Sequence, residues 1–283
     1  MNNLEEHDLF SPAPHYYDSA VKSQPILAEI RDVLRYRNLV VHLVKRDITA
    51  RYKRSLLGVG WTLLDPLLTM IVMAVVYSSL FRNQINDFPV FLLSGIVVWT
   101  FFQQASAEAM TNLMYSGSLL GKVYLPKSVF AVSAVGTGLV NFLLSLIPLA
   151  GFVIAFQRPV NWTLAFVPFA IVVLCAFTLG LGLFMSALAI FFADMVNIFN
   201  FLLRLLLYLS GIFYYTEYLP QWLAWMVRLN PTYHLIRLFR DPVFEGILPR
   251  WEIIVYGSCW AILMFFLGYW FFTRRSDEFV YRI

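Results

Sequence analysis

Charged residues are scarce in this chain of 283 residues: Asp, Glu, Lys and Arg together make up 13% of it. A soluble globular domain usually carries about 25% charged residues. Hydrophobic residues make up 60% of the chain, and a run of about twenty of them is enough to cross the hydrocarbon core of a bilayer. The composition therefore excludes an ordinary soluble domain and indicates a protein that crosses the membrane several times.

The chain also has few of the residues that build disulfides and metal sites. Its two cysteines, Cys175 and Cys259, lie inside apolar runs, where cysteine usually acts as a small buried hydrophobe. The four histidines are scattered along the sequence: His7, His15, His42 and His234. Gly117–Lys122 resembles a phosphate-binding loop, but its glycines are too close together and it lacks the Ser or Thr that would bind magnesium. We therefore expect no catalytic residue, no metal site and no cofactor on this chain.

Carboxylates are absent from the middle of the apolar runs. Asp65, Glu108 and Asp194 each fall near an end that we expect to be cytoplasmic. Transporters driven by ion gradients usually carry acidic residues or histidines near the membrane midplane. If this chain moves a solute uphill, the energy is therefore expected to come from a separate protein.

Six apolar runs predict transmembrane helices, so the fold class we expect is an all-α membrane protein. The runs cover approximately residues 56–81, 88–107, 129–156, 162–192, 196–213 and 253–272. With their connections they form a six-span transmembrane domain over residues 55–283. Asp65 and Pro66 lie inside the first run. We expect one short helix over residues 56–64 and a second helix that starts at Pro66, because Asp is a good N-cap and Pro is favoured at the first helical position.

The residues before the first run have a different pattern. Residues 1–25 are polar without periodicity and predict a flexible cytoplasmic tail. Residues 26–54 have apolar side chains three, four or seven apart, with basic residues such as Arg46, Arg51 and Lys53 between them. This pattern is typical of an amphipathic helix that lies along a membrane surface. A helix packed on a protein partner is the alternative.

The segment between the fifth and sixth runs, residues 214–250, is too interrupted for one span and too apolar for a solvated loop. Trp222 and Trp225 precede a break at Asn230–Pro231, and further apolar residues follow it. We expect a pair of short re-entrant helices that dip into the membrane. Proteins tolerate such backbone where other protein or a water-filled cavity surrounds it.

The basic residues indicate the orientation, because cytoplasmic loops carry an excess of Lys and Arg. With the N-terminus inside, every lysine falls on the cytoplasmic side: Lys22, Lys45, Lys53, Lys122 and Lys127. Six spans then also bring the C-terminal Arg274 and Arg275 into the cytoplasm.

Two features near the fifth run allow either a functional or a structural interpretation. Arg204 is the one charge well inside a predicted span, and it either meets an anionic substrate or extends its side chain to the membrane surface. Aromatic residues with polar edges crowd the outer end of this run and the segment after it: Tyr208, Tyr214, Tyr215, Tyr218, Trp222 and Trp225. They fit either the faces and hydroxyl rims of sugar rings or an ordinary interfacial belt.

The longest internal cytoplasmic loop is predicted over residues 108–128. It embeds apolar residues such as Leu119 and Leu120 in a polar frame, which indicates a short amphipathic helix. Such a helix either docks another protein or rests on the lipid surface.

Four segments, in this order, resemble the transmembrane subunit of type-2 ABC exporters, in particular the bacterial permeases that export O-antigen, capsule and teichoic-acid polymers. Val44–Leu68 resembles the interface helix of that family running into its first span, and Gly117–Lys127 resembles its cytoplasmic coupling helix. Leu229–Asp241 is similar to the segment before the last span, and Asp277–Ile283 fits the short basic tail. The resemblance covers nearly the whole chain after residue 25, and none of the segments specifies the polymer.

The resemblance implies a homodimeric permease in the bacterial plasma (inner) membrane, with both termini cytoplasmic. Two copies of a separate ABC ATPase subunit would bind below it, and ATP and magnesium would be bound there. That subunit would clamp the interface helix, with Arg46, Arg51 and Lys53, and the coupling helix. The coupling residues are Ser116, Gly117, Leu119, Leu120 and Lys122.

The same resemblance implies that the substrate is a lipid-linked glycan, O-antigen or a similar cell-surface polysaccharide, with membrane lipid around the protein and no nucleic acid partner. Spans one and five line the conduit in that family. Tyr208 and the aromatics near Tyr214 then become candidate sugar contacts, and Arg204 a candidate partner for the pyrophosphate of the lipid carrier. Teichoic acid, a drug or a lipid are alternative cargoes within the same fold. A membrane-embedded glycosyltransferase and a passive channel are alternatives of other classes.

Overall fold

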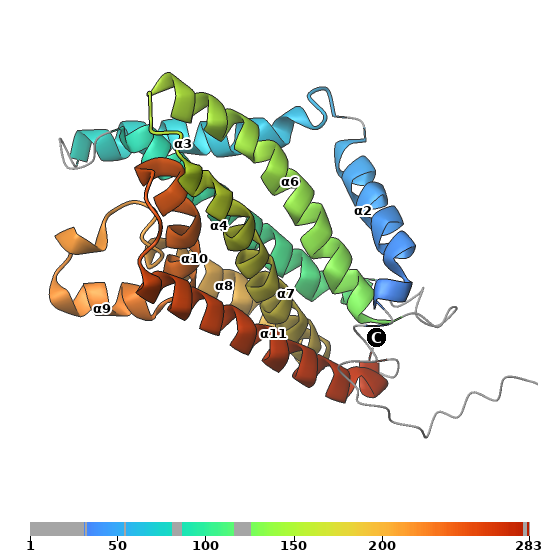
Figure 1. Ribbon diagram of the computed structural model, residues 1–283. Coiled ribbons are helices and arrows are strands. Elements are labelled where there is room, and N and C mark those ends of the chain that lie inside the picture. The colour runs from blue at the N-terminus through green and yellow to red at the C-terminus, as the bar shows by residue number, and fades with distance from the viewer. Residues whose placement is uncertain are drawn as a thin grey trace, which may run out of the picture.

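The computed structural model describes residues 31, 33–53, 55–80, 87–115, 126–279 and 282 (Figure 1). Within these ranges the protein is helical and has no β-strand, which confirms the predicted all-α class. In chain order the elements are α2 (Arg37–Tyr52), α3 (Gly60–Leu80), α4 (Phe88–Tyr115), α6 (Ser128–Ala155), the 3-10 helix η1 (Trp162–Phe166), α7 (Val167–Phe191), α8 (Met195–Tyr208), the 3-10 turn η2 (Thr216–Tyr218), α9 (Gln221–Leu229), α10 (Pro231–Arg240), the π-helical turn η3 (Asp241–Glu245) and α11 (Trp251–Phe279).

Four helical stretches in the described part of the chain are long and apolar enough to cross a membrane. They are Phe88–Tyr115, Ser128–Ala155, Trp162–Phe191 and Trp251–Ser276. Two shorter apolar helices, Gly60–Val76 and Met195–Tyr208, coincide with the first and fifth predicted runs. The chain is therefore a multi-pass membrane protein. The count of six spans stays a prediction, because α8 has 14 residues, fewer than the usual twenty.

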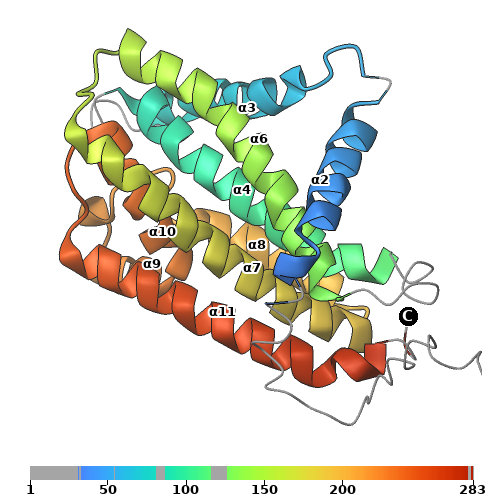
Figure 2. The same ribbon diagram turned by 45° about the vertical axis from the view of Figure 1, so that its right-hand side comes forward.

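α4 lies at the centre of the bundle. It packs against α6 on one side and α7 on the other, and α11 covers the far side of α7 (Figure 2). The buried part of α4 carries bulky apolar side chains, among them Phe91, Trp99 and Phe102. Hydrogen bonds within each helix satisfy its backbone, which is what a lipid environment requires.

The backbones of α7 and α11 approach each other at two facing glycines. A Cβ on Gly268 would overlap the carbonyl of Gly180, and a Cβ on Gly180 would overlap the backbone at Met264 and Phe265. Small residues allow such close contact between helices in membranes, where packing rather than a hydrophobic driving force holds helices together. These two helices therefore form the tightest pair in the described bundle.

α3 lies across α4 and α6 instead of running alongside them (Figures 1 and 2). The predicted helix restart at Pro66 is wrong, because α3 begins at Gly60 and continues through Pro66. A turn at Gly58 starts the helix earlier: its φ is +53°, a conformation that glycine adopts readily, and its N–H donates to Ser55 Oγ at 3.1 Å. Asp65 is consequently inside the helix and does not cap it.

α2 packs against α6. Leu43 is buried, and a Cβ on Gly136 of α6 would lie 3.0 Å from Val44 Cγ2. The helix that we expected over residues 26–54 is described over Arg37–Tyr52, with residues 33–35 also helical. The predicted tail, residues 1–25, and the start of the predicted helix lie outside the described residues.

The connection after α4 is shorter than expected. α4 continues to Tyr115, so the first eight residues of the predicted loop 108–128 are helical. Residues 116–125, which include the predicted coupling helix, lie outside the described part of the chain.

The segment after α8 forms two short helices, α9 and α10, as the sequence predicts. They meet at Asn230, whose side chain accepts a hydrogen bond from the Thr232 N–H at 3.0 Å and so caps α10, while Pro231 takes the first helical position. α10 is largely buried against α4, α7 and α11, whereas α9 is largely exposed. Whether the pair dips into a membrane stays a prediction.

We predict that Gly180→Ala lowers the free energy of unfolding by about 1–3 kcal/mol, the usual cost of overpacking, because the new methyl group meets the backbone of α11. The measurement is the thermal unfolding midpoint of the purified protein in detergent. Gly151→Ala is the control, since a Cβ there meets nothing within 4 Å. Equal midpoints for Gly180→Ala and the wild type would contradict the close contact.

Candidate functional site

A polar stripe runs along α4, the most buried of the long helices. Between residues 90 and 110, the positions that are not buried are Thr100, Gln103, Gln104, Ala107 and Glu108. Their spacing of three or four residues puts them on one face of the helix. All but one are polar, whereas a lipid-facing stripe would be apolar. This face of α4 is therefore built to meet water or a polar molecule.

The stripe forms the floor of a groove of about 440 Å³. α3 contributes one wall with Asp65, Thr69 and Met73, and α8 contributes the other with Asn200 and Leu207. Ile96, Trp99 and Phe213 complete the lining together with the α4 stripe. The first and fifth apolar runs, which the family resemblance assigns to a conduit, thus flank one groove in this chain.

Two contacts hold the polar groups of the floor. The indole N–H of Trp99 donates to Gln103 Oε1 at 3.0 Å, which fixes the orientation of that amide. Arg51 at the end of α2 forms an ion pair with Glu108. α2 is therefore tied directly to the stripe on α4.

Two of the predicted substrate residues lie beside the groove on α8. Arg204 and Tyr208 are both exposed, and they follow the groove residue Asn200 by four and eight positions along the helix. At 100° per residue, this spacing turns them progressively away from α4. Neither residue lines the groove; both lie at its edge, on the exposed face of α8.

The other predicted aromatics divide between half-buried and exposed positions. The Tyr214 hydroxyl donates to the Tyr208 carbonyl. The Tyr215 hydroxyl donates to Glu245 Oε1 at 3.0 Å, and its ring packs 4.7 Å from the ring of Phe91. Three of these aromatics are exposed: Tyr218, Trp222 and Trp225. Tyr215 is thus held in the bundle, and these three present their rings at its surface.

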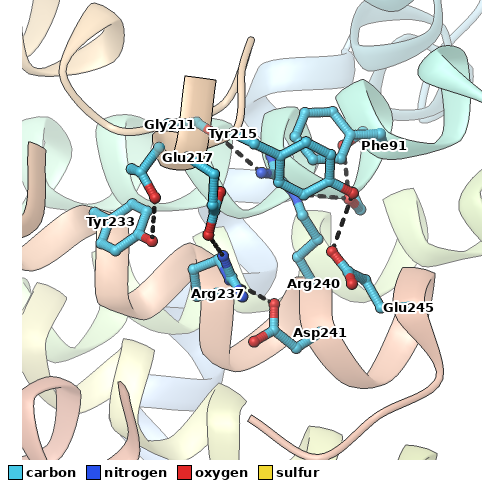
Figure 3. Close-up of polar contacts among 11 residues, drawn as sticks. Phe91, Gly211, Tyr215, Glu217, Tyr233, Arg237, Arg240, Asp241 and Glu245 are labelled. Atoms are coloured by element: carbon cyan, nitrogen blue, oxygen red, sulfur yellow. Dashed lines mark hydrogen bonds and ion pairs between the residues drawn. The ribbon is translucent and has the colours of Figure 1, made fainter. Parts of the chain in front are cut away.

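A buried arginine that the sequence did not single out holds the end of α8. Arg240 of α10 is 1% exposed, and its guanidinium lies 3.9 Å from the ring centre of Phe91 (Figure 3). Its Nη1 donates to the Gly211 carbonyl at 2.8 Å and its Nη2 to the Ile212 carbonyl at 3.2 Å. These carbonyls follow α8, where an unpaired carbonyl attracts a cation.

A serine and a glycine of α4 make room for the guanidinium of Arg240. Its Nε donates to Ser94 Oγ at 3.3 Å, and a Cβ on Gly95 would overlap the guanidinium. One turn earlier, Arg237 donates through Nε to Asp241 Oδ1 at 2.6 Å and approaches Glu217 Oε1 at 4.0 Å (Figure 3). Neither arginine was singled out from the sequence. The Arg237–Asp241 spacing was a usable signal, but nothing in the sequence marks Arg240 as buried.

The remaining predicted site residues lie on or beyond α2. Arg46 pairs with its neighbour Asp47 at 2.8 Å, and Lys53 is exposed at the end of the helix. The predicted coupling residues lie outside the described part of the chain: Ser116, Gly117, Leu119, Leu120 and Lys122. Within the described ranges, no group of three or more His, Cys, Asp or Glu side chains is arranged to bind a metal ion.

Comparison with known proteins covers both the groove and the Arg240 cluster. The model of the ABC-2 type transporter family matches residues 38–244. The chain is similar to the O-antigen export system permease protein RfbA of Myxococcus xanthus, with 29% identity over 252 residues that cover 88% of this chain and 97% of that protein. The protein of the same name from Klebsiella pneumoniae is 25% identical over 244 residues, 86% of this chain and 93% of its own length. The polysialic acid transport protein KpsM of Escherichia coli is 22% identical over 254 residues, 83% of this chain and 92% of its own.

We predict that Arg240→Ala lowers the free energy of unfolding by about 3 kcal/mol or more, because it leaves a cavity and removes the partner of two buried carbonyls. Arg250→Ala, at an exposed position in the segment before α11, should change it little. The measurement is the thermal unfolding midpoint of each purified variant in detergent. Similar midpoints for the two variants would show that the buried guanidinium does not stabilise the fold.

Proposed function

The chain belongs to the ABC-2 type transporter family, and from this membership we propose that it is the permease subunit of an ATP-driven transporter that exports a polysaccharide across the inner membrane. Its relatives include permeases named for O-antigen export and a protein named for polysialic acid transport. The match extends over most of this chain and nearly all of each of these relatives. The cargo we favour is a lipid-linked glycan such as O-antigen.

The observation that carries the proposal is the polar floor of the groove between α3 and α8. Amides and hydroxyls such as those of Gln103, Gln104 and Thr100 donate and accept hydrogen bonds, as sugar hydroxyls do. Trp99 and Phe213 add aromatic surface, and flat rings suit the apolar C–H faces of sugars. This chemistry favours a glycan over an apolar drug or lipid as the cargo.

We propose that the working unit is a homodimer in which the groove of each copy faces the other. In a single chain α3 and α8 expose apolar residues beside the groove, including Ile71 and Val72 on α3 and Phe201 and Leu205 on α8. A second copy packed on these helices would close the groove into a conduit. Arg204 and Tyr208, at the groove edge, would then face the passage, where Arg204 would meet the pyrophosphate of the lipid carrier.

Two copies of a separate ABC ATPase would supply the energy, with ATP and magnesium bound there and not on this chain. In this proposal six spans leave both termini in the cytoplasm, and the ATPase contacts the segment 116–122 and α2. The ion pair between Arg51 and Glu108 supports a mechanical link. A displacement of α2 would be carried through that pair to the stripe that forms the groove floor.

We predict that Asn200→Leu lowers polymer export roughly fivefold or more, because a hydrogen bond is worth about 1 kcal/mol and an apolar side chain would interrupt the groove wall. Asn197→Leu, the same change one turn earlier at an exposed position that does not line the groove, should export normally. The assay complements a host from which this chain has been deleted and measures surface glycan by immunoblot. Failure of the wild-type chain to restore export would overturn the proposed function.

Arg204→Ala and Tyr208→Ala are expected to lower export in the same assay while the dimer still assembles. Both side chains are exposed on α8, so their removal leaves the packed core intact. Assembly is measured by size-exclusion chromatography of the purified complex. Normal export by both variants would remove these residues from the path.

We predict that the purified chain alone hydrolyses no ATP, and that vesicles containing it without a second subunit do not accumulate glycan against a gradient. The measurements are phosphate release and uptake of lipid-linked glycan in reconstituted vesicles. Adding the ATPase purified from the same membrane should restore both. Substantial hydrolysis or uphill transport by the chain alone would contradict the division of labour.

A further inference from the structure

A second cavity lies on the other side of α3. Its volume is about 310 Å³, within the range of small-ligand pockets, and its walls come from the end of α2 and from α3, α4 and α6. Polar side chains from three helices meet there: Thr62 and Asp65 from α3, Thr100 and Gln104 from α4, and Asn141 and Ser145 from α6. Trp61, Phe101 and Phe142 are among the other residues that line it, and Arg51 lies at the α2 end.

α6 contributes a polar group with no partner to this cavity. Asn141 is 8% exposed, and its amide oxygen has no hydrogen-bond partner within the described ranges. Ser145, one turn further along, already donates its hydroxyl to the Phe142 carbonyl at 2.7 Å, so its oxygen is left to accept. A buried amide oxygen without a partner is costly in an apolar helix. Asn141 also lines the cavity, so its amide is one of the polar groups that a bound molecule can contact.

The cavity and the groove share part of their lining. Asp65 of α3 and Thr100 and Gln104 of α4 line both. α3 therefore forms a partition between two polar spaces that rest on one stripe of α4. Because Asp65 sits inside α3, its carboxylate is available at the joint between them.

We propose that this second cavity is a sugar-binding site, separate from the groove between α3 and α8, that holds one hydroxyl-rich unit of the glycan. The proposal rests on the proposed function, because it takes its ligand from the exported polymer. Asn141, Gln104 and Asp65 offer acceptors and donors at several sides of the cavity, which is the arrangement that a ring with several hydroxyls requires. The exposed ring of Trp61 offers flat surface to its C–H face. A lipid tail would leave these polar groups unpaired.

The first test uses cysteine labelling in a chain whose Cys175 and Cys259 are replaced by Ala and which is assembled with its native partners. A charged thiol reagent should modify Ser145→Cys at least about tenfold faster than Leu143→Cys, because such a reagent enters an aqueous cavity and is excluded from hydrocarbon. Leu143 is on the same helix, is 48% exposed and lines neither cavity. Membranes are opened so that the reagent reaches both sides.

The labelling is then compared in membranes from a host that makes the polymer and from an otherwise identical host whose polymer synthesis is blocked. Bound glycan should slow modification of Ser145→Cys several-fold in the first membranes and leave Leu143→Cys unaffected. Equal labelling rates in the two membranes would mean that the cavity holds only water, and that result overturns the proposal. Slow labelling of Ser145→Cys in both membranes would also overturn it, since the cavity would then be closed or filled with lipid.

A second variant connects the cavity to transport. Asn141→Leu should lower export several-fold while the chain assembles normally, because leucine suits an apolar helix and removes only the polar group. Normal export by Asn141→Leu would overturn the sugar site without touching the proposed function, which the wild-type chain tests in the same host. Failure of the wild-type chain to restore export would instead overturn both the sugar site and the proposed function.

Discussion

A polar side chain in the hydrocarbon region of a bilayer must meet another polar group or water, and the architecture of this chain follows from that constraint. In α4 the hydroxyl of Ser94 donates to the Phe91 carbonyl at 2.7 Å, and that of Ser106 donates to the Phe102 carbonyl at 2.6 Å. These groups are satisfied inside the packed helix. The polar residues that remain accessible, from Thr100 to Glu108, gather on the one face that α6 and α7 do not cover. The bundle thus separates polar groups that stabilise it from polar groups that line its cavities.

The buried guanidinium of Arg240 extends this logic to a charge. Two carbonyls after α8, a serine hydroxyl and the face of Phe91 together replace the water that the cation loses. The arrangement also positions the groove, because Phe213, which lines it, directly follows the Ile212 carbonyl that Arg240 binds. One end of the groove wall is therefore anchored, while the exposed part of α8 makes few contacts with the bundle.

The sequence was informative where a single residue type or a local pattern decides the outcome. Apolar runs located the helices, because only internally bonded backbone is stable in lipid. The break at Asn230–Pro231 was visible, because a cap and a proline define it locally. The continuation of α3 through Pro66 was missed, since the helix already begins at Gly60 after the turn at Gly58 and Asp65 does not cap a new helix. The extension of α4 to Tyr115 was missed because its last turns mix polar and apolar residues and so end the continuous apolar run.

The site was harder to predict, because it depends on which faces meet. The stripe has a helical spacing that is visible in the sequence at Gln103, Gln104 and Glu108. Whether these residues are exposed, however, depends on how α6 and α7 pack against α4. Arg240 has no local signal, since its partners lie 28 to 146 positions away along the chain. The roles of Arg204 and the aromatics stay predictions. Most of these residues are exposed in a single chain, and in the proposed dimer a second copy would lie next to them.

The glycine contact between α7 and α11 has a mechanical consequence. At Gly180 and Gly268 the two helices meet backbone against backbone, with no side chain between them at that point. α11 has 29 residues and is therefore roughly 44 Å long at about 1.5 Å per residue, longer than the hydrocarbon layer of about 30 Å. Because α11 packs so closely on α7, we expect the two helices to move as one rigid unit. A force applied at one end would then tilt the pair instead of bending it. Movement within the chain would then involve mainly α3 and α8, which are packed more lightly against the rest of the bundle.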